Sequence, residues 1–252
     1  MKFGIAGNGN AAHHFVKMLC DQGHVLTQVY ARTSDSISTD GDVEYITSPS
    51  LFSTKNDLVF LAVSDAAISS IAAEISTDMF VVHLSGMTSI DAISQSRKGV
   101  VWPVQSLSKR IEINYEQIPF LIEGSDSETA SILQKIFQSI SQHTKMANGD
   151  QRASTHLAAV FANNFANHLY ELSSDILLEN GFNLDLLLPM IRTQVEKLSV
   201  MSPHEAQTGP AVRMDLNTIE KQQTLLDSNP ALKEIYTTLT NSILQKFHGK
   251  KL

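Results

Sequence analysis

The stretch "FGIAGNGNAA", residues 3–12, decides the expected fold of this chain. Its first half is apolar, as in a buried strand, and a helical pattern begins after the spacing Gly7-x-Gly9-x-x-Ala12. Gly7 permits a tight turn out of the strand, and Gly9 removes a side chain that would block a diphosphate. The free N–H groups at the start of the helix would then face the phosphates. The stretch predicts a phosphate-binding turn, the alternative being a glycine turn without a ligand.

Short apolar runs alternate with helical patterns through the first 147 residues. Strands are expected at residues 2–7, 25–31, 57–63, 79–86, 100–103 and 119–124. Helices are expected at residues 11–22, 66–75 and 127–141. Because strands that alternate with helices at this spacing form parallel sheets, the pattern predicts an N-terminal α/β domain with a parallel sheet over residues 1–147.

From residue 148 onward every segment has the period of a helix. Helices are expected at residues 151–179, 184–200, 215–227 and 231–247, with a loop at 202–213. The pattern predicts an all-helical domain over residues 148–252. Because the helices after residue 151 carry more apolar surface than they need for themselves, we expect a homodimer through this domain.

The composition excludes several classes of protein. Hydrophobic residues make up 42% of the 252 residues and charged residues 18%, so a packed core is expected. The formal net charge of −7 argues against a nucleic-acid partner. The single cysteine, Cys20, excludes an intramolecular disulfide, and the nine histidines form no HExxH motif that would indicate a metal site. With no apolar run of about 20 residues and no signal-peptide pattern, we expect a cytoplasmic protein without a membrane segment.

The end of the second expected strand, "YARTS" at residues 30–34, indicates the cofactor. An NAD-binding domain usually places an acidic residue there, which binds the ribose hydroxyls. This chain has Arg32 instead, followed by Thr33 and Ser34, and an arginine with hydroxyl neighbours suits a 2′-phosphate. NADP is therefore favoured over NAD, the alternative being an exposed arginine at the end of a strand.

Two further expected strands end in small polar residues, "AVSD" at residues 62–65 and "HLSG" at residues 83–86. Ligands of open parallel sheets bind at this carboxyl edge, and small residues let the backbone approach a cofactor. Ser85 is a candidate to bond a nicotinamide amide or a substrate, whereas turn formation explains Ser64 equally well. His83 alternates with apolar neighbours and is interpreted as a core histidine.

A polar stripe follows the first long helix of the helical half, in "QRASTHLAAVFANNFANHLYE" at residues 151–171. Its members are Arg152, His156, Asn163 and Asn167. At 100° per residue these side chains lie within roughly 60° of one another. The rest of the helix is apolar on nearly every side, so we expect it to be buried and the stripe to have partners. Two interpretations stay open: bonds to other helices at a domain or subunit contact, or a stripe that faces the nicotinamide. In the second, His156 is the proton donor or acceptor and Asn163 orients the substrate.

The loop "QTGPAVRMD" at residues 207–215 is unusual. Thr208, Gly209 and Pro210 predict a rigid turn, which leaves Arg213 within reach of an anion. A plain interhelical loop with a solvated arginine is the commoner case.

The order of these motifs carries a family resemblance. After the glycine turn come "ART", "AVSD", "HLSG", "WPVQSL", "QRASTHLAAVFANN" and "TGPAVR". Together they resemble the Rossmann-like NADP-dependent oxidoreductases whose helical C-terminal half is a domain of unknown function, relatives of pyrroline-5-carboxylate reductase and the β-hydroxyacid dehydrogenases. The resemblance covers nearly the whole chain. It implies an NADP-binding Rossmann domain and a helical domain like that of 6-phosphogluconate dehydrogenase, which commonly dimerises, with the active site between the two.

The resemblance also implies roles for individual residues. It places cofactor contacts at Gly7, Asn8, Gly9, Asn10, Ala11, Arg32, Thr33, Val63 and Ser64. It places Ser85, Gly86, His156 and Asn163 at the cleft, with Gly86 as a further cofactor contact. Relatives often carry His-Pro where this chain has Trp102-Pro103, which puts any catalytic role of that histidine in doubt here, and Ser64 replaces a common proline.

We therefore expect an oxidoreductase that transfers a hydride between NADP and a C=O or C=N group of a small metabolite. The candidate catalytic residues are His156, Asn163 and Ser85, with His156 handling the proton. Arg152 or Arg213 would hold a substrate carboxylate, and Thr208 is a further candidate substrate contact. The alternative is a dinucleotide-binding sensor or scaffold that catalyses nothing. The sequence names neither the substrate nor the direction of the reaction.

Overall fold

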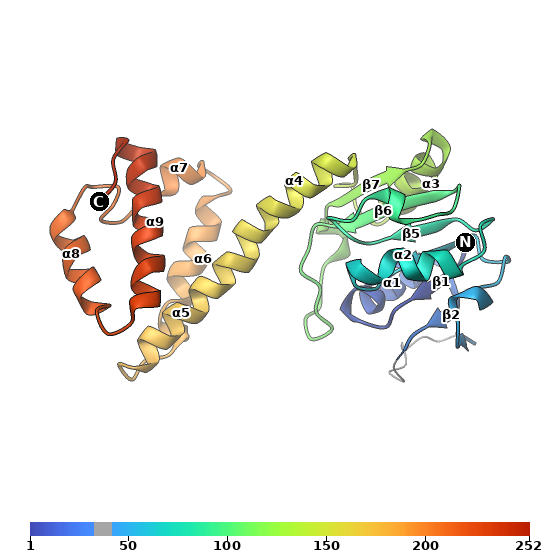
Figure 1. Ribbon diagram of the computed structural model, residues 1–252, viewed down its shortest axis with the longest axis horizontal. Coiled ribbons are helices and arrows are strands. Elements are labelled where there is room, and N and C mark those ends of the chain that lie inside the picture. The colour runs from blue at the N-terminus through green and yellow to red at the C-terminus, as the bar shows by residue number, and fades with distance from the viewer. Residues whose placement is uncertain (33–41) are drawn as a thin grey trace. The chain divides into compact units, whose positions relative to one another are not determined.

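The computed structural model describes residues 1–32 and 42–252, and the chain divides into two compact units, Met1–Ala162 and Asn163–Leu252 (Figure 1). The division falls within a long helical stretch. Helix α4 (Gly149–Ala159) belongs to the first unit, where Arg152 attaches it to the sheet through an ion pair with Glu123. The expected domain boundary between residues 147 and 148 stays a prediction.

Within the described residues, the first unit holds an eight-stranded sheet in the order β3-β2-β1-β4-β5-β6-β7-β8. The strands are β1 Lys2–Ala6, β2 Val25–Tyr30, β3 Glu44–Ile46, β4 Leu58–Leu61, β5 Val81–His83, β6 Lys98–Pro103, β7 Phe120–Gly124 and β8 Lys145–Met146. Because the chain builds outward in opposite directions from the neighbours β1 and β4, these two strands form the switch point at which such sheets bind ligands. The expected Rossmann-type α/β fold is confirmed.

Strand β7 departs from the expected parallel sheet. It pairs antiparallel with β6, whereas the other neighbouring strands of the described sheet pair parallel. The connection from β6 to β7 contains a 3₁₀ turn at Tyr115–Gln117 and no α-helix. A parallel return needs a longer crossover, usually through a helix, so this connection brings the chain back antiparallel. The expectation of an all-parallel sheet is wrong at this strand, and the short strands β3 and β8 were not expected.

Helices cover both faces of the sheet. Helices α1 (Asn10–Asp21) and α3 (Ser127–Gln138) pack on one face, and α2 (Asp65–Glu74) packs on the other. Phe15 of α1 lies at the centre of the first core, with 5.8 Å between its ring centroid and those of Phe60 and Phe137. This packing fixes the start of α1 at the carboxyl edge of β1.

Helical segments make up the second unit. A π-helical turn, Val160–Phe165, joins α4 to α5 (Ala166–Leu178), so the helix expected at residues 151–179 is one continuous helical stretch. It ends where Gly181 takes a φ of +77° and the Phe182 N–H donates to the Leu177 carbonyl at 3.0 Å. The remaining helices are α6 Leu188–Lys197, α7 Pro203–Ala206, α8 Leu216–Leu225 and α9 Pro230–His248. In the described part of the chain, no helix has both the length and the apolar character needed to cross a membrane.

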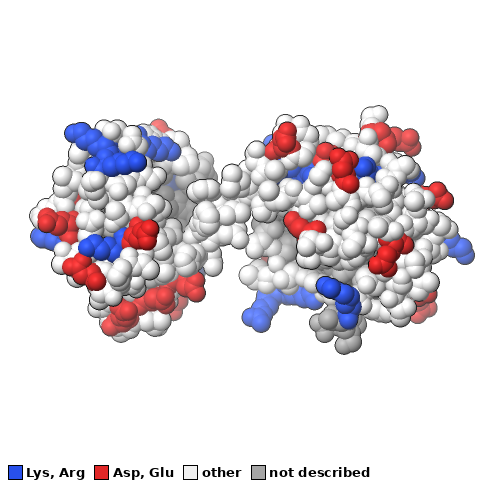
Figure 2. Space-filling model, viewed as in Figure 1, with Lys and Arg blue, Asp and Glu red and all other residues white. Residues whose placement is uncertain are grey.

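The long helical stretch is largely exposed in the single chain, so the burial expected of it stays a prediction. Large apolar side chains on it and on α6 are exposed, among them Leu157, Phe161, Leu178, Met190 and Val195. Figure 2 shows broad uncharged areas on this unit. The second unit has a small core of its own, built on Ala211, Ile219 and Leu244. A core of this size does not cover the apolar side chains of α5 and α6.

Candidate functional site

The glycine turn follows β1 at the switch point of the sheet. Gly7 has a φ of +113°, which L side chains rarely adopt, and a Cβ there would overlap the carbonyl oxygen of Ala62. The Gly7 N–H donates to the Tyr30 carbonyl at 2.7 Å, which ties the turn to the end of β2. The fold itself therefore requires glycine at position 7.

Gly9 is a glycine for a different reason. Its backbone conformation suits other residues, and a Cβ there would meet no described atom within 4 Å. Gly9 is the N-cap of α1, so no side chain caps the N–H groups of the first helical turn at Asn10, Ala11 and Ala12. That turn contains no acidic residue. Open space beside uncapped N–H groups at the positive end of a helix fits the diphosphate of a dinucleotide.

Arg32 lies two residues beyond Tyr30 and is exposed. Because the Tyr30 carbonyl accepts the hydrogen bond from Gly7, the end of β2 carries Arg32 next to the glycine turn. Its guanidinium is accessible to a phosphate on an adenosine ribose bound there. Thr33, which is also predicted to contact the cofactor at the end of this strand, lies outside the described residues.

Val63 and Ser64 follow β4 on the other side of the glycine turn. The Ala62 N–H donates to the Ala6 carbonyl at 2.8 Å, which extends the pairing of β1 and β4 to the edge of the sheet. Ser64 is the N-cap of α2, but its exposed side chain makes no capping hydrogen bond. Both residues lie at the edge where the cofactor contacts are expected, and the contacts stay a prediction.

The hydroxyl of Ser85 is engaged in three hydrogen bonds at the end of β5. It donates to Asp65 Oδ2 at 2.8 Å and accepts from the N–H groups of Met87 at 3.1 Å and Thr88 at 2.9 Å. A hydroxyl has one proton and two lone pairs, so these bonds use its full capacity. The predicted contact of Ser85 with a nicotinamide or a substrate would require one of them to break.

His83 is buried beneath this loop, as expected of a core histidine. The Ser85 N–H donates to His83 Nδ1 at 3.2 Å, and His83 Nε2 lies 3.3 Å from the Ser89 carbonyl. Nδ1 is therefore the unprotonated nitrogen, and Nε2 carries the proton that it donates to Ser89. Burial first and the charge of Arg152 second lower the pKa of His83 to about 4. The neutral ring holds both ends of the loop at residues 85–89.

Arg152, a predicted substrate contact, is 1% exposed. Its guanidinium forms an ion pair with Glu123 of β7 and donates through the other terminal nitrogen to the Thr88 carbonyl at 2.6 Å. Its Nε is buried without a hydrogen-bond partner among the described residues. These bonds join α4 to β7 and to the loop after β5. The role of Arg152 in binding a substrate carboxylate stays a prediction, and the geometry shows a residue that fixes α4 on the sheet.

His156 lies one helical turn beyond Arg152 and is half-buried. Its ring packs against Trp102 of β6, with 5.4 Å between ring centroids and an angle of 40° between the ring planes. A Cβ on Gly86 would lie 2.7 Å from both His156 Cδ2 and Trp102 Cε2, so Gly86 is packed closely against both rings. The structure thus brings His156, Gly86 and Trp102 together, and the roles predicted for His156 and Gly86 stay predictions.

The other predicted site residues belong to the second unit. Asn163 lies in the π-helical turn and is exposed. The wider π turn changes the helical register between His156 and Asn163, so the spacing of an ideal α-helix does not hold across it. Thr208 and Arg213 are exposed in the loop after α7, where Gly209 takes a φ of +111°. Their roles stay predictions.

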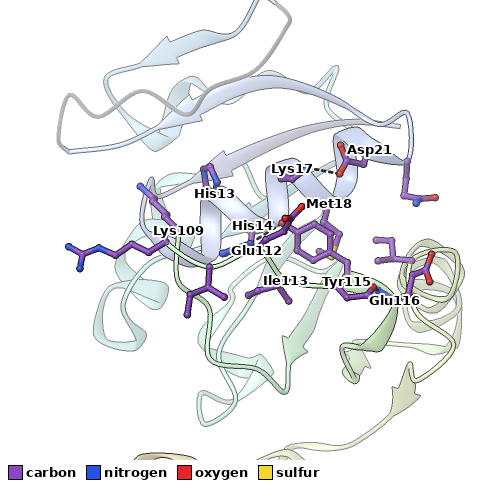
Figure 3. Close-up of a pocket in the computed structure, with 15 residues that line it drawn as sticks. His13, His14, Lys17, Met18, Asp21, Lys109, Glu112, Ile113, Tyr115 and Glu116 are labelled. Atoms are coloured by element: carbon purple, nitrogen blue, oxygen red, sulfur yellow. Dashed lines mark hydrogen bonds and ion pairs between the residues drawn. The ribbon is translucent and has the colours of Figure 1, made fainter. Parts of the chain in front are cut away.

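A cavity of about 520 Å³ lies along α1 and the connection between β6 and β7 (Figure 3). Its lining includes His13, His14 and Lys17 of α1 and Lys109 and Tyr115 of the connection. Lys17 forms an ion pair with Asp21 at 3.1 Å along the helix. Among the described residues, no group of three His, Cys, Asp or Glu side chains is placed to hold a metal ion.

Two side chains at the site were not singled out in the sequence, Lys109 and Glu123. Lys109 Nζ donates to the Asn8 carbonyl at 2.8 Å, and the Lys109 N–H donates to Asn10 Oδ1 at 3.2 Å. Lys109 and Arg110 form a basic pair beyond the carboxyl end of a strand, which is the signal that could have found the lysine. Glu123 alone carries no such signal, because its partner Arg152 lies in a different segment.

The family model that matches the chain is described as a domain of unknown function (DUF2520) and covers residues 118–243. A solved structure from Bacteroides fragilis, described as a candidate NADP oxidoreductase, is 32% identical to this chain. The match covers 97% of this chain and 98% of that chain, with a TM-score of 0.88. A search of curated proteins found no match.

Two more distant structures share the fold. A Plasmodium falciparum pyrroline carboxylate reductase with NADP bound is 14% identical, with a TM-score of 0.61 and 99% of this chain and 97% of that chain covered. A reductive aminase from Aspergillus terreus, in complex with NADPH and ethyl levulinate, is 15% identical. Its TM-score is 0.70, and 99% of this chain and 94% of that chain are covered. The matches confirm the resemblance to the structural group that includes pyrroline-5-carboxylate reductase.

Proposed function

The chain belongs to the DUF2520 family, and from this premise we propose that it is an NADP-dependent oxidoreductase acting on a C=O or C=N group of a small metabolite. The similar structure from Bacteroides fragilis is described as a candidate NADP oxidoreductase, and both more distant structures hold NADP or NADPH. The proposal includes an active site completed by residues of both domains, with Asn163, Thr208 and Arg213 contributed by the helical one.

One observation carries the proposal: the fold explains why position 7 is a glycine, but it does not explain the glycine at position 9. Gly7 is required by its positive φ and by the contact with Ala62, so the fold alone explains it. Gly9 has neither requirement, since a Cβ there would meet no described atom within 4 Å and would lie beside the uncapped N–H groups of α1. Space for a diphosphate accounts for a glycine at this place.

The remaining residues supply binding and proton transfer. The bound NADPH would supply the hydride, which is the chemistry of its nicotinamide ring. The N–H groups of Asn10 and Ala11 would hold the diphosphate, and Arg32 would pair with the 2′-phosphate. His156 would hold the proton that accompanies reduction of the C=O or C=N group, held in place by Trp102.

Cofactor titrations test the binding half of the proposal. We expect NADPH to bind the wild type more tightly than NADH, and Gly9→Val to weaken both by about 10-fold or more. We expect Arg32→Ala to weaken NADPH by about 10-fold and to leave NADH unchanged. Gly149→Val is a matched control, because a Cβ at Gly149 also enters open space, away from the turn. Equal affinities for NADPH and NADH, or an unaffected Gly9→Val protein, would overturn the cofactor assignment.

Turnover tests the chemical half. We expect the wild type to oxidise NADPH in the presence of a carbonyl or imine from a panel of small substrates. His156→Ala should lower kcat by about 10²-fold or more, the range found for general acid–base groups. His143→Ala removes an exposed histidine after α3 and serves as the control. Turnover unchanged in His156→Ala would clear this residue of a chemical role. A protein that binds NADPH but turns over no panel member would support the sensor.

A further inference from the structure

The connection between β6 and β7 is bound to the glycine turn through one residue, Lys109, by both its backbone and its side chain. The backbone N–H of Lys109 donates to the side chain of Asn10 at 3.2 Å, and its ammonium donates to the Asn8 carbonyl at 2.8 Å. Asn8 and Asn10 are separated from Lys109 by about a hundred residues of sequence. The ammonium of Lys109 is therefore held at the turn by contacts that the fold provides.

A buried histidine on α1 fixes the connection in this position. His14 Nε2 lies 2.9 Å from the carbonyl of Ser108, the residue before Lys109, and His14 Nδ1 lies 2.9 Å from the hydroxyl of Tyr115. A carbonyl only accepts, so Nε2 is the donor, and Nδ1 accepts the proton of the tyrosine hydroxyl. His14 thus clamps the connection at two points on either side of residues 109–114. Lys109 lies on an anchored segment.

Lys109 is followed by Arg110, and the lining of the adjacent cavity contains both basic and acidic residues, Glu112 among the latter. Figure 3 shows Lys109 and His13 at the same end of the cavity, and Figure 2 shows basic side chains gathered over the connection between β6 and β7. The pKa of His13 is lowered first by burial and then by neighbouring positive charge, which includes that of Lys109 and Lys17. The first turn of α1 adds its own positive end and no acidic residue. An anion would be attracted to this place.

We propose that Lys109 is a cofactor-binding residue, whose ammonium contacts the diphosphate of NADP bound on the glycine turn. An ammonium has three protons, and the Asn8 carbonyl takes one of them, which leaves donors for a phosphate oxygen. The inference rests on the proposed function, because it needs a dinucleotide on this turn. It adds a side-chain charge to a cradle otherwise made of backbone N–H groups.

The position of Lys109 favours the diphosphate over the 2′-phosphate. Its ammonium lies on the turn between the two glycines, beside the start of α1, where a dinucleotide places its diphosphate. Arg32 lies instead beyond the end of β2, where the ribose of the adenosine half binds. The two side chains should therefore affect different parts of the cofactor.

Calorimetric titration of NADPH and of NADH into the full-length protein tests this division. We expect Lys109→Met to weaken both cofactors by the same factor, on the order of 10-fold, since a charge-assisted bond is lost from a group they share. Lys109→Arg should recover most of the affinity, and added salt should weaken binding less in Lys109→Met than in the wild type. Arg110→Met removes the same charge from the next residue, also exposed, and should change either affinity by less than about 3-fold. Equal melting temperatures confirm that these exposed variants fold.

The outcomes separate the two proposals. If the wild type binds both cofactors and Lys109→Met binds them equally well, the role of Lys109 is overturned and the proposed function stands. A loss confined to NADPH would overturn the diphosphate assignment, because that pattern belongs to a contact with the 2′-phosphate. Equal losses in Lys109→Met and Arg110→Met would overturn a direct contact in favour of a general field. A wild type that binds neither cofactor overturns the proposed function, and the inference with it.

Discussion

Ser85 shows how hydrogen-bond capacity limits the role of a single side chain. Its one proton and two lone pairs are taken by Asp65, Met87 and Thr88. A substrate bond to Ser85 would have to replace one of these, at the cost of an unsatisfied partner. The geometry therefore shows Ser85 as a support of the loop beside Gly86, and its catalytic role stays a prediction.

His83 makes the folded chain sensitive to acid. Burial and then the charge of Arg152 lower its pKa from 6.5 to about 4 in the folded state. Below pH 6.5 the unfolded chain takes up a proton that the folded chain does not accept until about pH 4. Stability is therefore lost as the pH falls through this window. The full difference corresponds to about 3 kcal/mol of unfolding free energy.

Urea unfolding at pH 7 and pH 4.5, followed by the fluorescence of the single tryptophan Trp102, measures this effect. We expect His83→Asn to be less stable than the wild type at pH 7, because two hydrogen bonds of the loop are lost. The difference in unfolding free energy between the two proteins should narrow by about 2 kcal/mol at pH 4.5. Only the wild type is destabilised there, because its buried imidazole stays neutral while the unfolded chain takes up a proton. A gap that is the same at both pH values would contradict the assignment.

At the residue scale, local sequence predicted what local geometry requires. The spacing predicted a tight turn at Gly7, and its φ of +113° fits that prediction, since the turn is made within one short segment. The role of Gly9 stays a prediction. The bond from Lys109 to Asn8 joins residues about a hundred positions apart and leaves no pattern in the sequence. The pairing of Arg152 with Glu123 was missed for the same reason.

Helix α4 is attached to the sheet through a buried ion pair. Arg152 is almost fully buried, and its ion pair with Glu123 of β7 crosses from one element to the other. Removing one partner of a buried pair leaves an uncompensated charge, which costs several kcal/mol. We expect Glu123→Gln to lower the unfolding free energy of the first unit by about 3 kcal/mol.

The same urea unfolding, with Trp102 fluorescence as the probe, checks this expectation. Glu112→Gln is the control, because Glu112 is exposed in the connection between β6 and β7, and its loss should change stability by less than about 0.5 kcal/mol. If Glu123→Gln is as stable as this control, the ion pair does not hold α4 in place.

At the element scale, the hydrophobic pattern predicted where strands and helices lie better than it predicted the direction in which neighbouring strands pair. The run at 119–124 was expected as a strand and is β7, but its antiparallel pairing depends on the connection before it. The π-helical turn at Val160–Phe165 was also missed, because its residues have the composition of an ordinary helix. Nothing in the period of the sequence distinguishes one extra residue in a turn.

The exposed apolar side chains of α5 and α6 lead us to predict a homodimer through the helical unit. Leu178, Met190 and Val195 are 61%, 64% and 61% exposed in the single chain, and large exposed apolar areas mark interaction surfaces. Light scattering should give a mass of about twice 27.7 kDa. Met190→Glu combined with Val195→Glu should shift the mass to that of one chain. Each chain would then have to bury two carboxylates against the apolar surface of its partner.

Val25→Glu provides the control for the dimer. Val25 is 52% exposed at the start of β2 in the first unit, so its replacement should leave the mass unchanged. A wild type that remains monomeric at the highest concentrations reached would contradict the prediction. The sequence indicated the surplus of apolar helix surface, but not which residues would cover it, since period alone does not say what packs against a helix.

For the whole molecule, the central claim is that a dinucleotide binds with its diphosphate on the turn between β1 and α1. A crystal structure of the protein with NADPH measures this most directly. We expect the diphosphate oxygens within hydrogen-bond distance of the N–H groups of Asn10 and Ala11 and of Lys109 Nζ, with the 2′-phosphate at Arg32. A nucleotide bound elsewhere, or a side chain filling the space beside Gly9 in the presence of NADPH, would contradict the account.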